Sequence, residues 1–242
     1  MKTISYFIEF EESLDSAYSK TGKPKYNTPT TIEIMSFKFV NILNSLEEFN
    51  KSQCKVFDFE KSRDYLYSLI PDNFIGKVMN NRKKISDFMP VCTGIGNIIA
   101  TAVISERFKN ILDEFPLSSK EYILRNIDIY LKNEKLTDKY YLLIMPYIPT
   151  TELIFPKCVF IKESLLIDPD GIIQFSDDEE WGKNWIKYTP LQFTLPEKYK
   201  HLQMLYFDRG KLFVSYPLAK KLMYSDLTGF EYGRTRLFFE EP

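Results

Sequence analysis

The pattern of apolar and polar residues is most regular near the end of the chain. Apolar residues fill most of 203–207 and 212–215, and a glycine-containing segment at 208–211 separates the two runs. Two apolar, aromatic-rich runs joined in this way are typical of a β-hairpin. The glycine allows a positive φ in the turn, and Asp208 would face Lys211 as an opposite charge across the strands.

A short helix is predicted directly after this hairpin. Ser215 occupies an N-cap position, and Pro217 lies in the first turn, where a missing N–H is tolerated. Segment 226–229 then ends the helix and leads into a strand at 230–232. We expect two lysines on the outer face and three apolar residues on the inner face: Leu218, Leu222 and Met223.

Two further helices are indicated in the first half of the chain. Residues 105–115 have apolar positions at spacings of three and four, with Ser105 placed to cap the helix and Pro116 placed to end it. A weaker apolar spacing at 66–70 predicts one or two helical turns before Pro71. The predicted buried face of the stronger helix consists of Phe108, Ile111, Leu112 and Phe115.

Most remaining apolar segments are short and rich in β-branched and aromatic residues, and they predict strands. A second hairpin is predicted from 165–167 and 172–175, with a turn at 168–171. Strands outnumber helices and do not alternate with them regularly, so the predicted fold class is α+β, a mostly antiparallel sheet with a few packed helices. The other predicted strands are 4–10, 30–35, 55–59, 139–144 and 155–161.

The chain has no internal repeat, low-complexity linker or sharp domain boundary. Its 242 residues fit one large domain or two small ones. A division near residue 100 gives an N-terminal α+β region at 1–100 and a C-terminal α+β region at 101–242. One continuous domain is the alternative.

Composition narrows the class of protein. The apolar share is 44%, and 32 Lys and Arg balance 33 Asp and Glu, so the chain is a near-neutral globule and general nucleic-acid binding is not indicated. The N-terminus reads as a strand rather than a signal peptide, and no apolar run approaches the ~18 residues of a membrane helix. The three cysteines are widely spaced and fit neither a disulfide framework nor a zinc site. We therefore expect a soluble cytoplasmic protein without a membrane partner.

The residues offer little for catalysis. His201 is the single histidine and lies among basic residues, which excludes a two-histidine metal site and disfavours a catalytic triad. The Gly-x-Gly at 93–97 lacks the further residues of a phosphate loop, so a turn is the better interpretation. Asp168 and Asp170 are explained as turn residues. The sequence therefore predicts that the protein is not an enzyme and binds no cofactor or metal.

One segment stands out as a candidate surface for a protein partner. Four consecutive acidic residues precede two tryptophans, which could form an anionic recognition surface with an aromatic rim. The alternative interpretation is an exposed loop whose tryptophans close the core. The candidate residues are Asp177, Asp178, Glu179, Glu180, Trp181 and Trp185.

The second half of the chain resembles a known group of proteins. The segment from Ser105 to Leu112 resembles the "S-x-R-hydrophobic-K-x-x-L" helix of bacterial polymorphic-toxin immunity proteins. Residues 155–160, the hairpin at 203–215 and the segment from 214 to 230 resemble the elements that come after this helix in those proteins. The families concerned are the immunity protein families numbered forty-three and eleven, and the resemblance covers residues 103–232.

This resemblance implies a non-enzymatic antidote. Such a protein binds a cognate toxin domain and neutralises it by blocking the active site or the entry of substrate. Two other classes stay open: a hydrolase that uses carboxylates alone, and a non-catalytic adaptor of a secretion system. Rescue of cells from a toxin encoded just upstream would distinguish the antidote from both.

Overall fold

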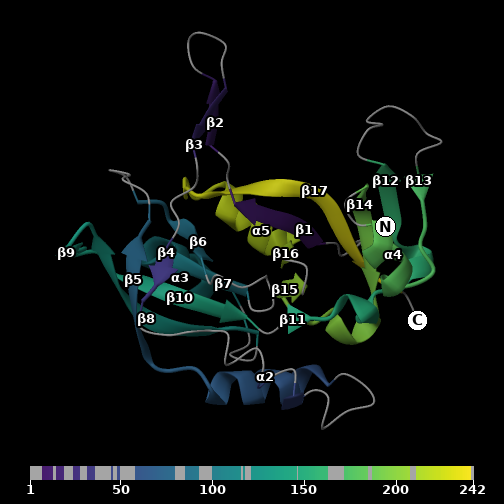
Figure 1. The fold of residues 1–242 in the computed structure, drawn as a ribbon, viewed down its shortest axis with the longest axis horizontal. Coiled ribbons are helices and arrows are strands. Elements are labelled where there is room, and N and C mark those ends of the chain that lie inside the picture. The colour runs from purple at the N-terminus through teal and green to yellow at the C-terminus, as the bar shows by residue number, and fades with distance from the viewer. Residues whose placement is uncertain are drawn as a thin grey trace.

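The fold is that of a computed structural model of the 242-residue chain. Two large β-sheets and four α-helices make up most of the part that the structure describes (Figure 1). Most strand pairs are antiparallel, which confirms the predicted α+β class. The described residues are 7–12, 15–18, 24–27, 32–35, 45, 48–49, 58–79, 85–92, 100–115, 117, 121–145, 147–162, 172–184, 187–207 and 211–240.

Within the described residues, six strands close into a barrel. Strand β10 pairs with β7 along one edge and with β8 along the other, so the order β7-β6-β4-β5-β8-β10 returns to its start. The pairs β4–β6 and β5–β8 are parallel, and the other four are antiparallel. The strands are β4 (Ile32–Ile34), β5 (Asn73–Val78), β6 (Phe88–Cys92), β7 (Ala100–Ser105), β8 (Ile123–Leu131) and β10 (Tyr140–Met145), with β9 (Glu134–Lys135) added at the end of β8.

Aliphatic side chains fill the inside of this barrel. Buried and exposed positions alternate along β5, as expected for a strand with one inward face. Gly76 lies on the inward face, where a Cβ would come within 2.7 Å of Ile32 Cγ2 and 2.9 Å of Ile127 Cδ1. A six-stranded barrel therefore has no room for a side chain at this position.

The second sheet has eight strands in the described part of the chain. Its order is β11-β15-β16-β1-β17-β14-β12-β13. A separate hairpin, β2–β3, projects from the body of the molecule in Figure 1. The strand bounds are β1 (Phe7–Glu12), β2 (Asp15–Tyr18), β3 (Pro24–Asn27), β11 (Tyr147–Ile148), β12 (Val159–Lys162), β13 (Ile172–Ile173), β14 (Tyr188–Leu195), β15 (Met204–Phe207), β16 (Lys211–Ser215) and β17 (Phe230–Phe239).

The helices cover the sheets at different places. Helix α2 (Phe59–Ser68) closes one end of the barrel, where Leu66 and Ile70 join the interior side chains. Helices α3 (Glu106–Asp113) and α5 (Tyr216–Met223) pack into an apolar layer shared by the barrel and the second sheet. Helix α4 (Asp178–Asn184) and the 3₁₀ helices η1 (Thr150–Glu152), η2 (Phe155–Lys157) and η4 (Glu197–Tyr199) border an aromatic-rich core. No described helix has the length and apolar character needed to span a membrane.

A polar contact network joins the barrel to the second sheet. Asp87, which is 7% exposed, accepts hydrogen bonds from Ser105 Oγ at 2.7 Å and from the backbone N–H of Thr228 at 3.0 Å. Arg107 lies 3.6 Å from the same carboxylate. Gly229 follows with a φ of 100°, and a Cβ there would lie 2.0 Å from the carbonyl oxygen of Phe88. The loop before β17 is therefore held directly against the barrel.

Several predicted elements are confirmed. The hairpin near the end of the chain is β15–β16, with Met204 opposite Val214. The helix at 105–115 is α3, and Ser105 Oγ accepts the hydrogen bond of the Phe108 N–H at 3.2 Å. The predicted strand at 139–144 is β10, and the weak helical spacing before Pro71 belongs to α2.

The predicted division near residue 100 falls at the start of β7. Both large sheets take strands from before and after this position.

Two predicted strands are wrong in part. Asp58 is the N-cap of α2 and accepts a hydrogen bond from the Lys61 N–H at 3.1 Å, so the strand predicted at 55–59 does not include Asp58 or Phe59. The strand predicted at 155–161 begins only at Val159, because Phe155–Lys157 form η2. Pro156 cannot donate to a strand ladder, which explains the change. Residues 55–57 lie outside the described residues.

The predicted helix at α5 is confirmed, but one of the three residues assigned to its inner face is exposed. Leu218 and Leu222 are buried, but Met223 is 54% exposed. Met223 lies five residues after Leu218, which places it about 140° further around the helix. Ser215 holds the N-cap position without a capping bond, because its hydroxyl donates to Gln203 Oε1 at 2.6 Å.

The second predicted hairpin is described only in part. Strand β13 pairs with β12, with Phe160 opposite Ile173. The predicted first strand at 165–167 and its turn at 168–171 lie outside the described residues, as do the segment 93–97 and the turn 208–210 of the other hairpin.

Candidate partner-binding surface

Helix α4 is attached to the body of the molecule through Trp181. The Trp181 side chain is 3% exposed, and its ring centroid lies 5.3 Å from that of Phe160 and 5.7 Å from that of Phe193. Tilted and edge-on contacts at these distances add to the large apolar area that a tryptophan buries. This packing determines which side of the short helix faces outward.

The start of α4 is fixed by a reciprocal pair of hydrogen bonds. Asp177 Oδ1 accepts the backbone N–H of Glu180 at 2.8 Å. Glu180 Oε2 in turn accepts the backbone N–H of Ser176 at 2.7 Å and the Ser176 hydroxyl at 2.9 Å. The arrangement follows the logic of a capping box, in which two acidic side chains satisfy N–H groups that the helix leaves unpaired.

The other two acidic residues also have described partners. Asp178 Oδ1 accepts the hydroxyl of Thr150 at 2.6 Å, and Thr150 is 1% exposed. This bond ties α4 to η1. Glu179 pairs with Lys183 one turn later at 2.8 Å, but both side chains are largely exposed, so the pair adds only a few tenths of a kcal/mol.

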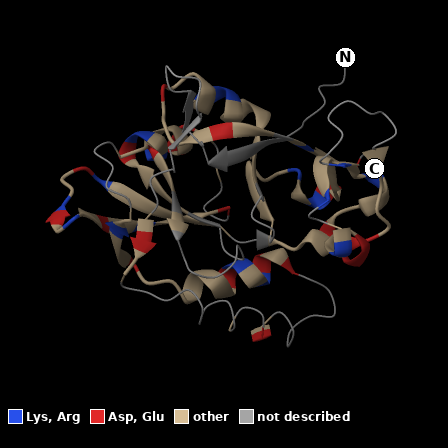
Figure 2. Ribbon diagram, turned by 45° about the horizontal axis from the view of Figure 1, so that its top comes forward, with Lys and Arg blue, Asp and Glu red and all other residues tan. Residues whose placement is uncertain are grey.

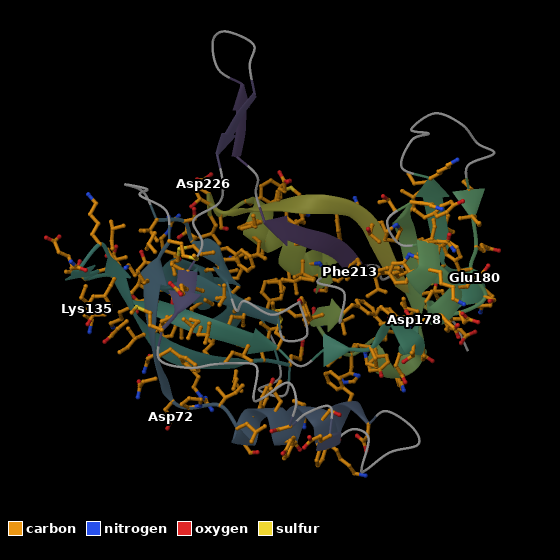
Figure 3. The ribbon with its side chains drawn as sticks, viewed as in Figure 1. Asp72, Lys135, Asp178, Glu180, Phe213 and Asp226 are labelled. Atoms are coloured by element: carbon orange, nitrogen blue, oxygen red, sulfur yellow. The ribbon has the colours of Figure 1, made fainter. Side chains whose placement is uncertain are left out.

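Hydrogen bonds at the start of α4 favour the ionised form of Asp177. The hydrogen bond from the Glu180 N–H lowers the pKa of Asp177 below its ordinary value, and the Ser176 hydroxyl acts in the same direction. Negative charge at a helix N-terminus is also favoured by the helix dipole. Glu180 Oε1 accepts no hydrogen bond in the described structure and is open to a partner. The start of α4 therefore presents fixed carboxylates to solvent (Figures 2 and 3).

The structure places five of the six predicted residues. Asp177, Glu179 and Glu180 are exposed, and Asp178 is partly buried. Trp181 belongs to the core, so it is not part of an aromatic rim, and the alternative interpretation describes it correctly. Trp185 lies outside the described residues. Thr150, 28 residues before Asp178, is a supporting residue that no sequence pattern indicated.

Other groups singled out in the sequence are accounted for differently. His201 is exposed. Cys158 is fully buried, and burial raises the pKa of its thiol to about 11, so it is protonated at neutral pH and unreactive. Among the described residues no group of three or more His, Cys, Asp or Glu side chains is arranged to hold a metal ion.

Helix α5 carries a second exposed feature that the sequence pattern missed. Tyr216, Met223 and Tyr224 are 44%, 54% and 74% exposed. Large exposed apolar side chains are common at protein–protein interfaces. Nothing in the described structure indicates which molecule would contact them.

Comparison with known proteins found no match. No family model matches the sequence, and no curated protein matches it.

Proposed function

We propose that this protein is an immunity protein that binds a cognate secreted toxin domain and neutralises it by steric block of the active site. The observation that supports this most is the preorganised acidic start of α4. Four consecutive carboxylates lie at one helix end; hydrogen bonds hold three of them in place, and the fourth, Glu179, forms an exposed pair with Lys183.

Preorganisation matters because ordering side chains on binding lowers affinity. Each mobile side chain that becomes fixed in an interface costs about 0.5–1.5 kcal/mol. Asp177, Asp178 and Glu180 are already fixed by hydrogen bonds in the free protein. A partner with Lys or Arg side chains at matching positions therefore loses less on binding here than at a flexible acidic loop.

The sign of the charge indicates the kind of toxin. Toxin domains that act on nucleic acid need a basic substrate surface, and an acidic inhibitor can occupy that surface in place of the phosphates. Electrostatic complementarity then accelerates capture. On this proposal the protein acts in the cytoplasm, binds protein rather than nucleic acid, uses no cofactor and catalyses no reaction.

Coexpression tests the proposal. The chain is expressed in cells together with the product of the gene immediately upstream, and growth is compared with cells that express the upstream product alone. Rescue that requires this chain supports the antidote. A variant in which the four acidic residues of α4 become Asn or Gln should rescue less well at the same expression level.

Two outcomes would contradict the proposal. One is a toxic upstream product that this chain does not counteract although both proteins accumulate. The other is turnover of a substrate by the purified chain in a panel of phosphodiester, glycoside and ADP-ribose substrates, which would favour a carboxylate-dependent hydrolase.

A further inference from the structure

The barrel has polar groups at the end that α2 covers. Leu66 of α2 and Ile70, which follows the helix, close this end with apolar contacts, and Tyr67 packs against the same cluster. The loop that follows α2 leads through Asp72 into β5, and the start of β8 pairs alongside, with Asn73 opposite Asn126. The start of β8 therefore lies beside the segment that leads from α2 into β5.

Arg125 lies on the inward-facing side of β8. Side chains alternate between the two faces of a strand, so Arg125 is on the same face as Ile127 and Ile129, which face the barrel interior. The Arg125 side chain is only 24% exposed. Nη1 donates to the carbonyl oxygen of Leu124 at 3.3 Å. Nε is buried and makes no hydrogen bond in the described structure, and its nearest carboxylate oxygen is Asp72 Oδ1 at 3.6 Å.

The Nε edge of a guanidinium presents two parallel N–H groups and is one of the edges that bind carboxylates and phosphates in a bidentate manner. In Arg125 this side has no hydrogen-bonded acceptor within the described residues. Asp72 forms an ion pair with Arg125 across 3.6 Å, which is too long for a hydrogen bond, and its side chain is 89% exposed. Figure 3 shows Asp72 at the edge of the molecule. The buried Nε–H is therefore costly, because it has lost its water without gaining a hydrogen bond within the described part of the chain.

Tyr67 supplies a second donor without an acceptor. Its hydroxyl is buried and has no hydrogen-bond partner among the described residues. The charges of Arg63, Asp64, Glu121 and Arg125 also act on the pKa of this phenol, so the oxygen lies within electrostatic range of both arginines. Burial raises the pKa of Tyr67, so the hydroxyl is a neutral donor at physiological pH.

The nearest buried carboxylate is already used by the backbone. Glu121, which is 3% exposed, accepts the N–H groups of Gln203 at 2.5 Å and Met204 at 3.1 Å. Arg63 is also buried and directs Nε and Nη2 to Asp64. This end of the barrel therefore combines the buried Arg63 side chain and the buried Nε of Arg125 with a phenol that has no acceptor among the described residues.

We propose that the α2-covered end of the barrel binds a small oxyanion, a phosphate or a carboxylate, through Arg125 and Tyr67. Such an anion accepts from Nε–H and from the phenol O–H and compensates the guanidinium charge, which a bound water does not do. A metal cation does not fit here, because a guanidinium has no lone pair to offer and repels a second positive charge. The 24% exposure of the Arg125 side chain leaves a route from solvent.

Titration of the purified full-length chain tests the site. Inorganic phosphate, acetate and chloride are titrated at constant ionic strength, and binding is followed by calorimetry and by the midpoint of thermal unfolding. We expect saturable stabilisation by phosphate or acetate and none by chloride. Phosphate alone would indicate a free anion as ligand, whereas equal binding of acetate would indicate a carboxylate from a metabolite or a side chain.

Variants connect the binding to the two residues. Tyr67→Phe keeps the ring and should weaken oxyanion binding roughly tenfold or more, as expected for loss of a hydrogen bond to a charged group. Arg125→Lys keeps the charge and removes the bidentate side, so it should weaken binding by at least as much. The matched control is Tyr199→Phe, because Tyr199 donates to Glu152 at 2.9 Å elsewhere in the molecule.

The results that would overturn the proposal are specific. One is the absence of any effect of phosphate or acetate beyond that of chloride. The other is equal binding by the wild type, Tyr67→Phe and Arg125→Lys, which would place the anion elsewhere on the protein.

Discussion

The start of α4 and the α2-covered end of the barrel both carry charged groups, but they differ in the exposure of these groups and in their hydrogen-bond partners. At α4 three of the four carboxylates are exposed and Asp178 is partly buried, and each has a described internal contact. At the barrel end the Tyr67 hydroxyl and the Nε of Arg125 are buried and have no hydrogen-bond acceptor among the described residues. The first region can meet a large partner without rearrangement, because its charges are stable in water. On the proposal made above, a small oxyanion completes the second.

Removal of the anchor of α4 should have the largest effect on stability. Trp181→Ala empties a site lined by Phe155, Phe160 and Phe193 and should lower the free energy of unfolding by about 3–5 kcal/mol. Urea unfolding measures the change. Glu179→Ala on the same helix is the control and should stay within about 0.5 kcal/mol, because that side chain is 81% exposed. Equal effects of the two variants would mean that Trp181 does not anchor the helix.

Two tyrosines, one with an acceptor for its hydroxyl and one without among the described residues, allow the two regions to be compared by the same substitution. Tyr199, which lies near η1 on the α4 side, donates to the carboxylate of Glu152 at 2.9 Å, whereas the Tyr67 hydroxyl has no described acceptor. Tyr199→Phe should cost about 1.5–3 kcal/mol, because it removes a hydrogen bond to a charged group. Tyr67→Phe, measured without phosphate or acetate, should leave the free energy of unfolding unchanged or raise it, because it removes a buried donor that has no acceptor among the described residues. A large loss in Tyr67→Phe would reveal an acceptor and remove the basis of the anion site.

A third variant disturbs the barrel and leaves α4 untouched. Gly76→Ala places a Cβ 2.7 Å from Ile32 Cγ2 and 2.9 Å from Ile127 Cδ1, so overpacking should cost about 1–3 kcal/mol. Adding Ile127→Val removes one of the two crowded atoms and should recover part of the loss, as measured by urea unfolding. A stable single variant would show that the interior has spare volume.

Local signals in the sequence were sufficient for α3, α5 and the β15–β16 hairpin. Each has its cap, its apolar spacing or its turn within about a dozen residues. Barrel closure could not be predicted, because the parallel pairs β4–β6 and β5–β8 join segments whose own patterns do not name a partner. Residues 55–59 carry two conflicting signals. Their apolar and polar positions alternate as in a strand, but Asp58 is also a suitable helix N-cap, and in the structure it has that role.

The candidate surface was predictable in part. The run of four acidic residues can be recognised from the sequence alone, and three of the four are exposed in the structure. The burial of Trp181 agrees with one of the two interpretations offered from the sequence, but the sequence could not decide between them, because a helix of seven residues has too few positions to define a face. The hydrogen bond from Thr150 to Asp178 depends on the tertiary fold alone.

The smallest expected effect depends on pH. Asp177→Ala removes the cap of α4 and should lower the unfolding temperature by roughly 2–4 °C at neutral pH. The pKa of Asp177 is lowered in the folded state, so its contribution is present above the ordinary value of 3.8 and is lost as pH falls through the lower folded pKa. The difference between the wild type and the variant should therefore be constant from pH 7 to about pH 5 and shrink in stronger acid. A difference that grows in acid would contradict this assignment.

The central claim is that the acidic start of α4 captures a basic toxin domain, and association kinetics test it most directly. The toxin identified by rescue is mixed with the wild type, with a variant neutralised at Asp177, Asp178, Glu179 and Glu180, and with a control neutralised at four exposed acidic residues of the barrel. The control residues are Glu33, Asp128, Glu134 and Asp138.

We predict that the α4 variant lowers the association rate constant roughly tenfold or more at low salt, and that the wild-type rate falls steeply as salt is added. The barrel control should associate at nearly the wild-type rate. An association rate that is the same for the wild type and the α4 variant at every salt concentration would contradict the account.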